Sequence, residues 1–183
     1  GLGEVLKHGV IADEELFALC EKRVGGISRR DNEVVQELVV KSCAVKAKVV
    51  AEDELESGWR KILNFGHTVG HAIESALGHG TLRHGECVGL GMLAETAWAV
   101  DRGLCAESVL FRLQGLMSSL EMCCAVSRVS SDALVTAISV DKKREGGTIE
   151  LAVPLRIGEV RLRRLPMDEV IQMLNRVPVA VEE

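Results

Sequence analysis

An apolar repeat with the period of an α-helix runs through most of the first 125 residues of this chain. Its clearest stretch spans residues 32–54, where apolar side chains return every three or four positions. These side chains are Val34, Val35, Leu38, Val39, Cys43, Val45, Val49 and Val50. A helix with one apolar face gains most of its stability from packing against another element. The repeat therefore predicts a mostly α domain of several packed helices.

Capping residues and glycines divide this repeat into separate helices. An N-terminal helix precedes Asp13, which is placed to cap a second helix over residues 14–20. Glycines at positions 78, 80 and 103 are natural helix stops. Further helices are expected over residues 32–54, 65–77, 86–101 and 107–120.

The pattern changes in the last third of the chain. A short helix is expected over residues 131–140, and a last one over residues 168–176. Residues 148–153 and 160–165 alternate between apolar and polar side chains, as strands do, and the proline and glycine of residues 154–158 suit a turn between them. The predicted fold is therefore mostly α, with a small β-hairpin near the C-terminus.

Composition narrows the class of protein further. A hydrophobic content of 47% with 27% charged residues is typical of a globular domain, and the length favours a single domain over residues 1–183. The 22 basic and 27 acidic residues give a net charge of −5, so no nucleic-acid partner is expected. A membrane partner is not expected either, because no uncharged apolar run approaches 18 residues.

The cysteines and the N-terminus favour a cytoplasmic location. The six cysteines show no C-x-x-C spacing, so we expect reduced packing residues rather than disulfides or zinc thiolates. Residues 1–8 carry acidic and basic side chains and lack the apolar run of a secretory leader.

Histidines form the densest group of candidate functional residues. Four of the five histidines lie between positions 67 and 84. His67 and His71 are four residues apart and share a helical face, where two imidazoles and a third group can hold a divalent metal. Exposed or hydrogen-bonded histidines would show the same spacing, so both interpretations stay open. A zincin is excluded, because Thr68 stands where the H-E-x-x-H motif needs its glutamate.

Several cations can reach this group once the helices pack. Lys46 and Arg60, which lies just upstream of Asn64, converge on the histidines if their helices are antiparallel. Fixed cations beside a metal suit a substrate with a carboxylate or a phosphate. A solvated helix face is the alternative for Lys46. Glu4 and Lys7 are three residues apart and share a face of the N-terminal helix, where they can also be an ordinary exposed pair.

Motifs in order along the whole chain resemble the 3-dehydroquinate synthase family. They are residues 4–13 (EVLKHGVIAD), 46–50 (KAKVV), 53–60 (DELESGWR), 63–72 (LNFGHTVGHA) and 84–86 (HGE). Residues 141–143 and the region 147–158 resemble the C-terminal pattern of the family as well. The resemblance covers only the C-terminal, metal-binding half of the family's proteins.

The family fold implies how this chain is organised. Its members combine an N-terminal Rossmann-like domain for NAD with a helical C-terminal domain, and the active site lies between the two. We expect the NAD domain to be absent from this chain, which contains no strand-glycine-helix dinucleotide unit. The resemblance also implies a homodimer.

The resemblance assigns roles to individual residues. Glu4, His67 and His84 match the ligands of a divalent metal, for which zinc and cobalt fit equally well. Lys7, Lys46 and Arg60 match residues that contact the substrate's hydroxyls and carboxylate. Asn64, His71 and one of Lys142 and Lys143 match residues near its phosphate.

The reaction implied is that of an NAD- and metal-dependent carbon–oxygen lyase. It converts 3-deoxy-D-arabino-heptulosonate 7-phosphate to 3-dehydroquinate and phosphate, in the shikimate pathway of aromatic amino-acid biosynthesis. A chain of this size should fold alone, but without a hydride acceptor the isolated fragment is expected to be inactive.

Three alternative functions stay open. One is another sugar-phosphate cyclase, such as a 2-deoxy-scyllo-inosose synthase, although Arg60 favours a substrate with a carboxylate. Another is a metal-dependent polyol dehydrogenase with a similar helical domain. The third is a non-catalytic helical interaction module, against which the joint presence of Glu4, His67 and His84 argues.

Overall fold

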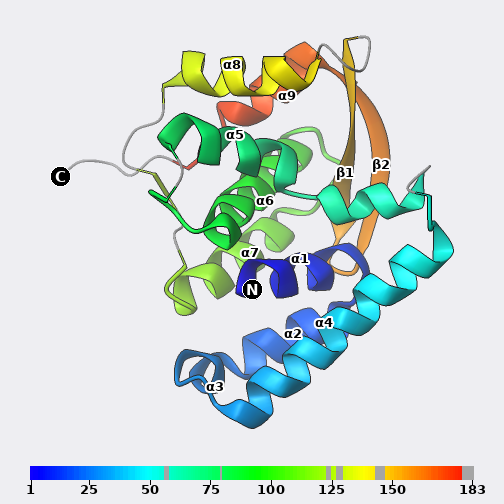
Figure 1. The fold of residues 1–183 in the computed structure, drawn as a ribbon, viewed down its shortest axis with the longest axis vertical. Coiled ribbons are helices and arrows are strands. Elements are labelled where there is room, and N and C mark those ends of the chain that lie inside the picture. Colours follow the sequence, from blue (N-terminus) through cyan, green and yellow to red (C-terminus); the bar gives the residue numbers. More distant parts are fainter. Residues whose placement is uncertain (56–57, 79, 123–124, 127–129, 143–146, 179–183) are drawn as a thin grey trace.

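Figure 1 shows the computed structural model of the chain, which describes residues 1–55, 58–78, 80–122, 125–126, 130–142 and 147–178. In chain order its elements are α1 (Leu2–Ala12), α2 (Glu14–Lys22), α3 (Val24–Ser28), α4 (Asn32–Glu52), the 3₁₀ helix η1 (Trp59–Asn64), α5 (His67–Leu77), α6 (His84–Asp101), α7 (Glu107–Ser119), α8 (Ser131–Lys142), β1 (Thr148–Arg156), β2 (Glu159–Pro166) and α9 (Met167–Leu174). The predicted mostly α fold with a C-terminal hairpin is confirmed.

Helix α6 lies at the centre of the fold and contacts α1, α5, α7, α9 and β1 (Figure 1). Nearly all of its side chains from Cys87 to Ala99 are buried. A helix that is apolar on all sides is typical of a domain centre. Glycines at positions 89 and 91 let neighbouring helices approach its backbone closely.

Helix α1 packs against α2, α4 and α6 and carries the first part of the site described below. Asp13 caps α2 as expected, because its side chain accepts a hydrogen bond from the Leu16 amide at 2.9 Å. In the same way Asp31 caps α4, accepting from the amides of Glu33 and Val34 at 3.0 and 3.2 Å. These caps fix where α2 and α4, which both contact α1, begin.

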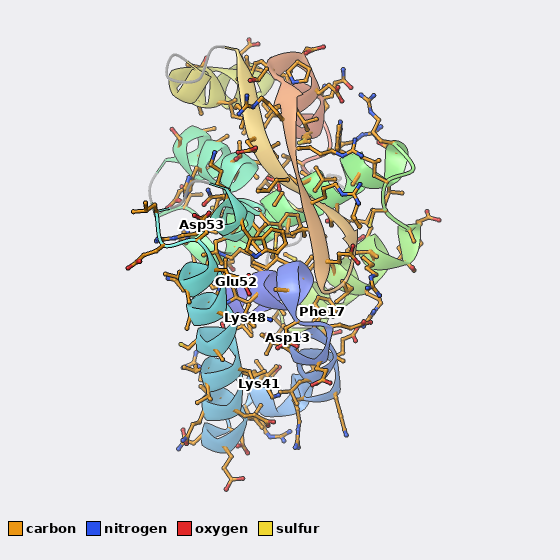
Figure 2. The ribbon with its side chains drawn as sticks, turned by 90° about the vertical axis from the view of Figure 1, so that its right-hand side faces the viewer. Asp13, Phe17, Lys41, Lys48, Glu52 and Asp53 are labelled. Carbon is orange, nitrogen blue, oxygen red and sulfur yellow. The ribbon has the colours of Figure 1, made fainter. Side chains whose placement is uncertain are left out.

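The hairpin is correctly predicted, but its expected turn over residues 154–158 is wrong. Pro154 pairs with Val160 inside the ladder, β1 continues to Arg156, and the chain turns at residues 157–158. Proline is tolerated there because both strands of a two-stranded sheet are edge strands. Gly158, with φ of 84°, donates its amide to the Val10 carbonyl at 2.9 Å. The hairpin is thereby attached to the end of α1, near Asp13 and Phe17 in Figure 2.

Helix α4 ends at Glu52, two residues before the predicted end. Asp53 leaves the helical conformation, and its side chain accepts hydrogen bonds from the amides of Gly58 and Arg60 at 2.8 and 2.9 Å. Figure 2 shows Glu52 and Asp53 at this end of α4. Asp53 therefore links the end of α4 to the start of η1.

The predicted starts of α5 and α6 are each wrong by two residues. Helix α5 begins at His67 instead of residue 65, because Gly66 adopts a left-handed conformation with φ of 75°. Helix α6 begins at His84 instead of residue 86, because the Glu86 side chain accepts the Arg83 amide at 3.0 Å and closes the first turn. Smaller shifts affect the ends of α7, α8, α9 and both strands.

Two short elements were not expected from the sequence. Helix α3 contains Gly25 and Gly26, which have low helix propensity, and η1 has the three-residue period that an apolar repeat of 3.6 does not reveal.

Among the described cysteines, Cys20, Cys87 and Cys105 are buried, whereas Cys43 is exposed, contrary to expectation. Cys123 and Cys124 lie outside the described residues. Within the described residues, no helix has both the length and the apolar character needed to cross a membrane.

Candidate metal centre

The N-terminal turns of three helices bring Glu4, His67 and His84 together. Glu4 lies in the first turn of α1, His67 opens α5 and His84 opens α6. The Nε2 atoms of His67 and His84 lie 3.3 Å and 4.0 Å from the same atom, Oε1 of Glu4. Ligand atoms around a tetrahedral zinc ion are about 3.3 Å apart. The three side chains therefore converge at distances that suit one small cation.

Both histidines are held through their other ring nitrogen. Nδ1 of His67 lies 3.2 Å from the carbonyl oxygen of Phe65, and Nδ1 of His84 lies 3.2 Å from Oε2 of Glu74. Histidines that bind metals almost always donate this second N–H to a carbonyl or a carboxylate, which fixes the tautomer and leaves Nε2 free as a ligand. The two rings thus have the orientation that metal ligation needs.

His71 lies beside the same two rings. Its ring centroid is 5.4 Å from that of His67 and 5.7 Å from that of His84. One ring nitrogen from each of the three histidines can be chosen so that all three atoms lie within 4.8 Å of one another. His67 and His71 share a face of α5, as their spacing predicts, and His71 is exposed. By geometry alone His71 is also within reach of a cation.

The Glu4 carboxylate has one oxygen occupied and one without a hydrogen-bond partner. Its Oε2 accepts a hydrogen bond from Lys7 Nζ at 2.7 Å, whereas Oε1 is buried and forms no hydrogen bond. Burial raises the pKa of Glu4, but His67 and Lys7 outweigh burial and hold this pKa well below its usual value. An ionised, buried oxygen that faces two imidazole nitrogens fits a divalent cation.

Lys7 and Lys46 form a small region of positive charge beside Glu4. Lys7 is buried, and its pKa is lowered mainly by burial and also by Lys46, while Glu4 opposes the shift. Nδ1 of His8 lies 2.7 Å from Ser42 Oγ, which ties α1 to α4 near these two lysines. Lys46 therefore lies close enough to Lys7 to lower its pKa, while the convergence of Lys46 on the histidines stays a prediction.

Close contacts between glycines let the three helix ends meet. A β-carbon on Gly3, next to Glu4, would lie 2.3 Å from the carbonyl oxygen of Gly85, next to His84. A β-carbon on Gly66, next to His67, would lie 2.5 Å from Met92 Cγ. Since real side chains essentially never come this close, Glu4 and His67 each follow a residue that has to be glycine.

The remaining predicted site residues are less clearly placed at the centre. The Arg60 guanidinium donates to the backbone carbonyl of Glu54 at 3.0 Å, in the turn after α4. Asn64 is exposed at the end of η1. Lys142 ends α8, and Lys143 lies outside the described residues. Helices α5 and α8 pack together, so the backbone at Lys142 belongs to a neighbour of the histidine helix.

A cavity of about 170 Å³ opens beside His71. Thr68, His71 and Ser75 of α5 line one side of it, and Ala137 and Ile138 of α8 line the other. Hydroxyl groups and an imidazole at the wall of a small cavity can bind an oxyanion or a sugar hydroxyl. The cavity extends the histidine cluster towards α8.

Two carboxylates of the site were missed by sequence reasoning. Glu74 lies seven residues after His67 and three after His71, so its spacing along α5 was a usable signal. Glu95 is buried, with 2% of its surface exposed, and accepts the Gly66 amide at 2.9 Å. Its signal was a lone acid within the apolar run of α6.

Solved structures share the fold of this chain. One is ValA, a 2-epi-5-epi-valiolone synthase from Streptomyces hygroscopicus subsp. jinggangensis with NAD⁺ and Zn²⁺ bound, at a TM-score of 0.83 and 23% identity, covering 96% of this chain and 49% of that one. Another is a 2-deoxy-scyllo-inosose synthase with carbaglucose-6-phosphate, NAD⁺ and Co²⁺, at a TM-score of 0.73 and 18% identity, covering 95% of this chain and 50% of that one. The fold is therefore the one that occupies half of each of these synthases.

Sequence comparison then defines the family. Residues 1–144 match the family described as 3-dehydroquinate synthase C-terminal, and the chain belongs to it. A curated 3-dehydroquinate synthase of Caldanaerobacter subterraneus subsp. tengcongensis is 38% identical over 175 residues, which cover 96% of this chain and 49% of the relative. One of Pelobacter propionicus is 36% identical over 173 residues, which cover 94% and 48%. The chain thus spans about half the length of these relatives.

Proposed function

We propose that this chain is the metal- and substrate-binding half of a 3-dehydroquinate synthase. The whole enzyme would convert 3-deoxy-D-arabino-heptulosonate 7-phosphate to 3-dehydroquinate and phosphate. One observation carries the proposal: Nε2 of His67 and of His84 both face Oε1 of Glu4, which is buried without a hydrogen-bond partner. Family membership and the relatives at 36–38% identity support the choice of reaction.

Glu4, His67 and His84 would hold the divalent metal, with zinc and cobalt as candidates. Three protein ligands leave positions open for substrate, as a catalytic metal site requires. His71 would stay outside the ligand set and face the substrate, because it lines the neighbouring cavity. Phe65 and Glu74 would fix the orientation of the two ligand imidazoles.

Lys7 would have two tasks in the site. By donating to Oε2 of Glu4, its ammonium group keeps that oxygen occupied and leaves Oε1 to point at the histidines. Together with Lys46 it provides positive charge where an anionic substrate and its hydroxyls would bind. Lys7 is nearly enclosed, so this charge acts in a medium with little water to screen it.

The other polar residues would orient the two ends of the substrate. Arg60 would bind its carboxylate, since a guanidinium matches a carboxylate with two parallel hydrogen bonds. Asn64, His71 and one of Lys142 and Lys143 would bind its phosphate. The cavity between α5 and α8 supports binding of the phosphate there. His71 lines this cavity, and Lys142 follows the lining residue Ile138 by four positions on α8.

The cofactors would complete the chemistry when bound. A divalent metal polarises a substrate oxygen, and NAD accepts a hydride and returns it within one turnover. We place NAD mainly on a separate Rossmann-like domain, with residues 1–183 as one helical domain. The isolated chain would then be inactive. We further propose a cytoplasmic homodimer that binds no nucleic acid and no membrane, in keeping with the net charge of −5.

Grafting tests the function directly. Residues 1–183 would replace the matching half of the Caldanaerobacter subterraneus synthase, and phosphate release from the heptulosonate phosphate would be measured with NAD and zinc. We expect turnover by the graft and none by the same graft with His84→Ala. A folded graft that turns over another sugar phosphate but not this substrate would instead support a different sugar-phosphate cyclase. A folded graft without activity on any of them would overturn the proposal.

A further inference from the structure

Glu95 is a buried carboxylic acid that the proposed chemistry does not use. It lies on α6 among apolar neighbours, with 2% of its surface exposed. Its Oε2 accepts the backbone amide of Gly66 at 2.9 Å, while Oε1 is buried without a partner. Enclosing a half-satisfied carboxyl group costs stability relative to an apolar side chain. A residue that costs stability at this position calls for a functional reason.

The start of α5 has no capping side chain of its own. Its N-cap residue is Gly66, and no side-chain hydrogen bond caps the helix from that position. A side chain cannot be placed there, because a β-carbon would lie 2.5 Å from Met92 Cγ and 2.7 Å from the Val88 carbonyl oxygen. The cap therefore has to come from another element. Glu95 reaches the Gly66 amide from α6, the helix packed behind α5.

Gly91 lets Glu95 approach so closely. It precedes Glu95 by one helical turn and lies on the same face of α6. A β-carbon on Gly91 would lie 2.0 Å from the carbonyl oxygen of Gly66. The backbone of Gly66 is thus enclosed by Gly91, Met92 and Glu95 of one helix face.

One peptide group links Glu95 to His67. The Gly66 N–H and the Phe65 carbonyl belong to the same peptide unit, which is trans, so they point in opposite directions. Oε2 of Glu95 accepts that N–H at 2.9 Å, and the Phe65 oxygen lies 3.2 Å from Nδ1 of His67. Hydrogen bonds in such a chain polarise one another.

We propose that Glu95 is a positioning residue of the metal centre, acting through the Phe65–Gly66 peptide to aim Nε2 of His67 at Glu4 and His84. The inference rests on the proposed metal site. The carboxyl group acts as a hydrogen-bond acceptor and needs no charge, since burial raises the pKa of Glu95 to about 8 against the opposing effect of the Gly66 and Val69 amides. Glu95 thus fixes the orientation of the His67 ring through a peptide group, whereas Glu74 contacts the His84 ring directly.

The experiment compares two variants of Glu95 with a neighbouring control. Zinc affinity is measured by competition with a chelator, and exchange of the Gly66 amide proton is measured by NMR in the zinc-free chain. Glu95→Leu should weaken zinc binding about tenfold or more and speed Gly66 exchange. Glu95→Gln keeps an acceptor oxygen and should stay within about threefold of wild type in both. Thr96→Val removes a buried hydroxyl that donates to the Met92 carbonyl of its own helix and should change neither measurement.

Each result separates the two claims. Equal zinc affinity in folded Glu95→Leu and wild type would overturn the positioning role and leave the metal site intact. A loss of affinity in Glu95→Gln as large as that expected of Glu95→Leu would also overturn it, even if Glu95→Leu fails to fold. Absence of zinc binding by wild type would overturn the proposed metal site itself.

Discussion

Gly3 and Gly85 meet backbone to backbone, so that a β-carbon on Gly3 would lie 2.3 Å from the Gly85 carbonyl oxygen. This contact joins the first turns of α1 and α6 and sets Glu4 beside His84. The contact is asymmetric, because a β-carbon on Gly85 would be 3.5 Å from the Gly3 nitrogen, an ordinary van der Waals distance. The two glycines therefore differ in what they tolerate.

Gly3→Ala should separate α1 from α6. The added methyl group meets backbone atoms that cannot rotate away, so we expect the variant to lose about 1–3 kcal/mol of unfolding free energy. Zinc affinity should fall about tenfold or more, because Glu4 moves with α1. Chemical denaturation and chelator competition measure the two effects. Gly85→Ala is the matched control and should leave both near wild type; equal effects of the two substitutions would contradict the asymmetry.

Glu74 should matter to zinc through His84. Its Oε2 lies 3.2 Å from Nδ1 of His84. Removing such a partner of a metal-binding histidine typically costs 10- to 100-fold in affinity. We expect this range for Glu74→Ala in a chelator competition, with no change for Ser75→Ala, the exposed neighbour on α5. Wild-type affinity in Glu74→Ala would show that the His84 ring is oriented by something else.

Glu95 should make the unfolding free energy depend on pH between about 5 and 8. Burial raises the pKa of Glu95 in the folded state to about 8, above its ordinary value of 4.5. The protonated carboxyl group therefore makes its full contribution to the unfolding free energy below pH 4.5. This contribution is lost as the pH rises towards 8. Wild type should lose up to about 1.4 kcal/mol per pH unit relative to Glu95→Gln in this window. Parallel pH profiles for the two proteins in denaturation experiments would refute the shift.

The planar guanidinium of Arg60 should bind the substrate carboxylate better than the ammonium group of a lysine would. In the full-length enzyme, Arg60→Lys should lower kcat/KM about tenfold or more, equivalent to about 1.4 kcal/mol, because lysine cannot form two parallel hydrogen bonds. Lys41→Arg on α4, labelled in Figure 2 away from Asp53, serves as the control and should keep wild-type kinetics. Unchanged kinetics for Arg60→Lys would remove this residue from the carboxylate site.

Periodicity predicted the helices well and their ends less well. The repeats in α4, α5, α6 and α7 depend on burial of one or more faces, which the sequence records directly. Their ends depend on single side chains that reach over several residues, such as Asp53 to Gly58 and Arg60. The hairpin turn was misplaced because Pro154 signals a turn in general, but is tolerated in an edge strand.

The site was predictable only in part from the residues themselves. The spacing of His67 and His71 placed both on one face, yet nothing local connects either of them to Glu4. That connection depends on glycine contacts between helices, which become meaningful only in three dimensions. The link from Glu95 to His67 passes through a backbone peptide and leaves no side-chain motif in the sequence.

The central claim is that Glu4, His67 and His84 bind one divalent cation in this chain's fold. Titration of zinc into wild type, His84→Ala and His71→Ala, with bound metal counted by elemental analysis, tests it most directly. We expect one equivalent for wild type and for His71→Ala, and loss of tight binding for His84→Ala. One equivalent bound to His84→Ala as tightly as to wild type would contradict the claim.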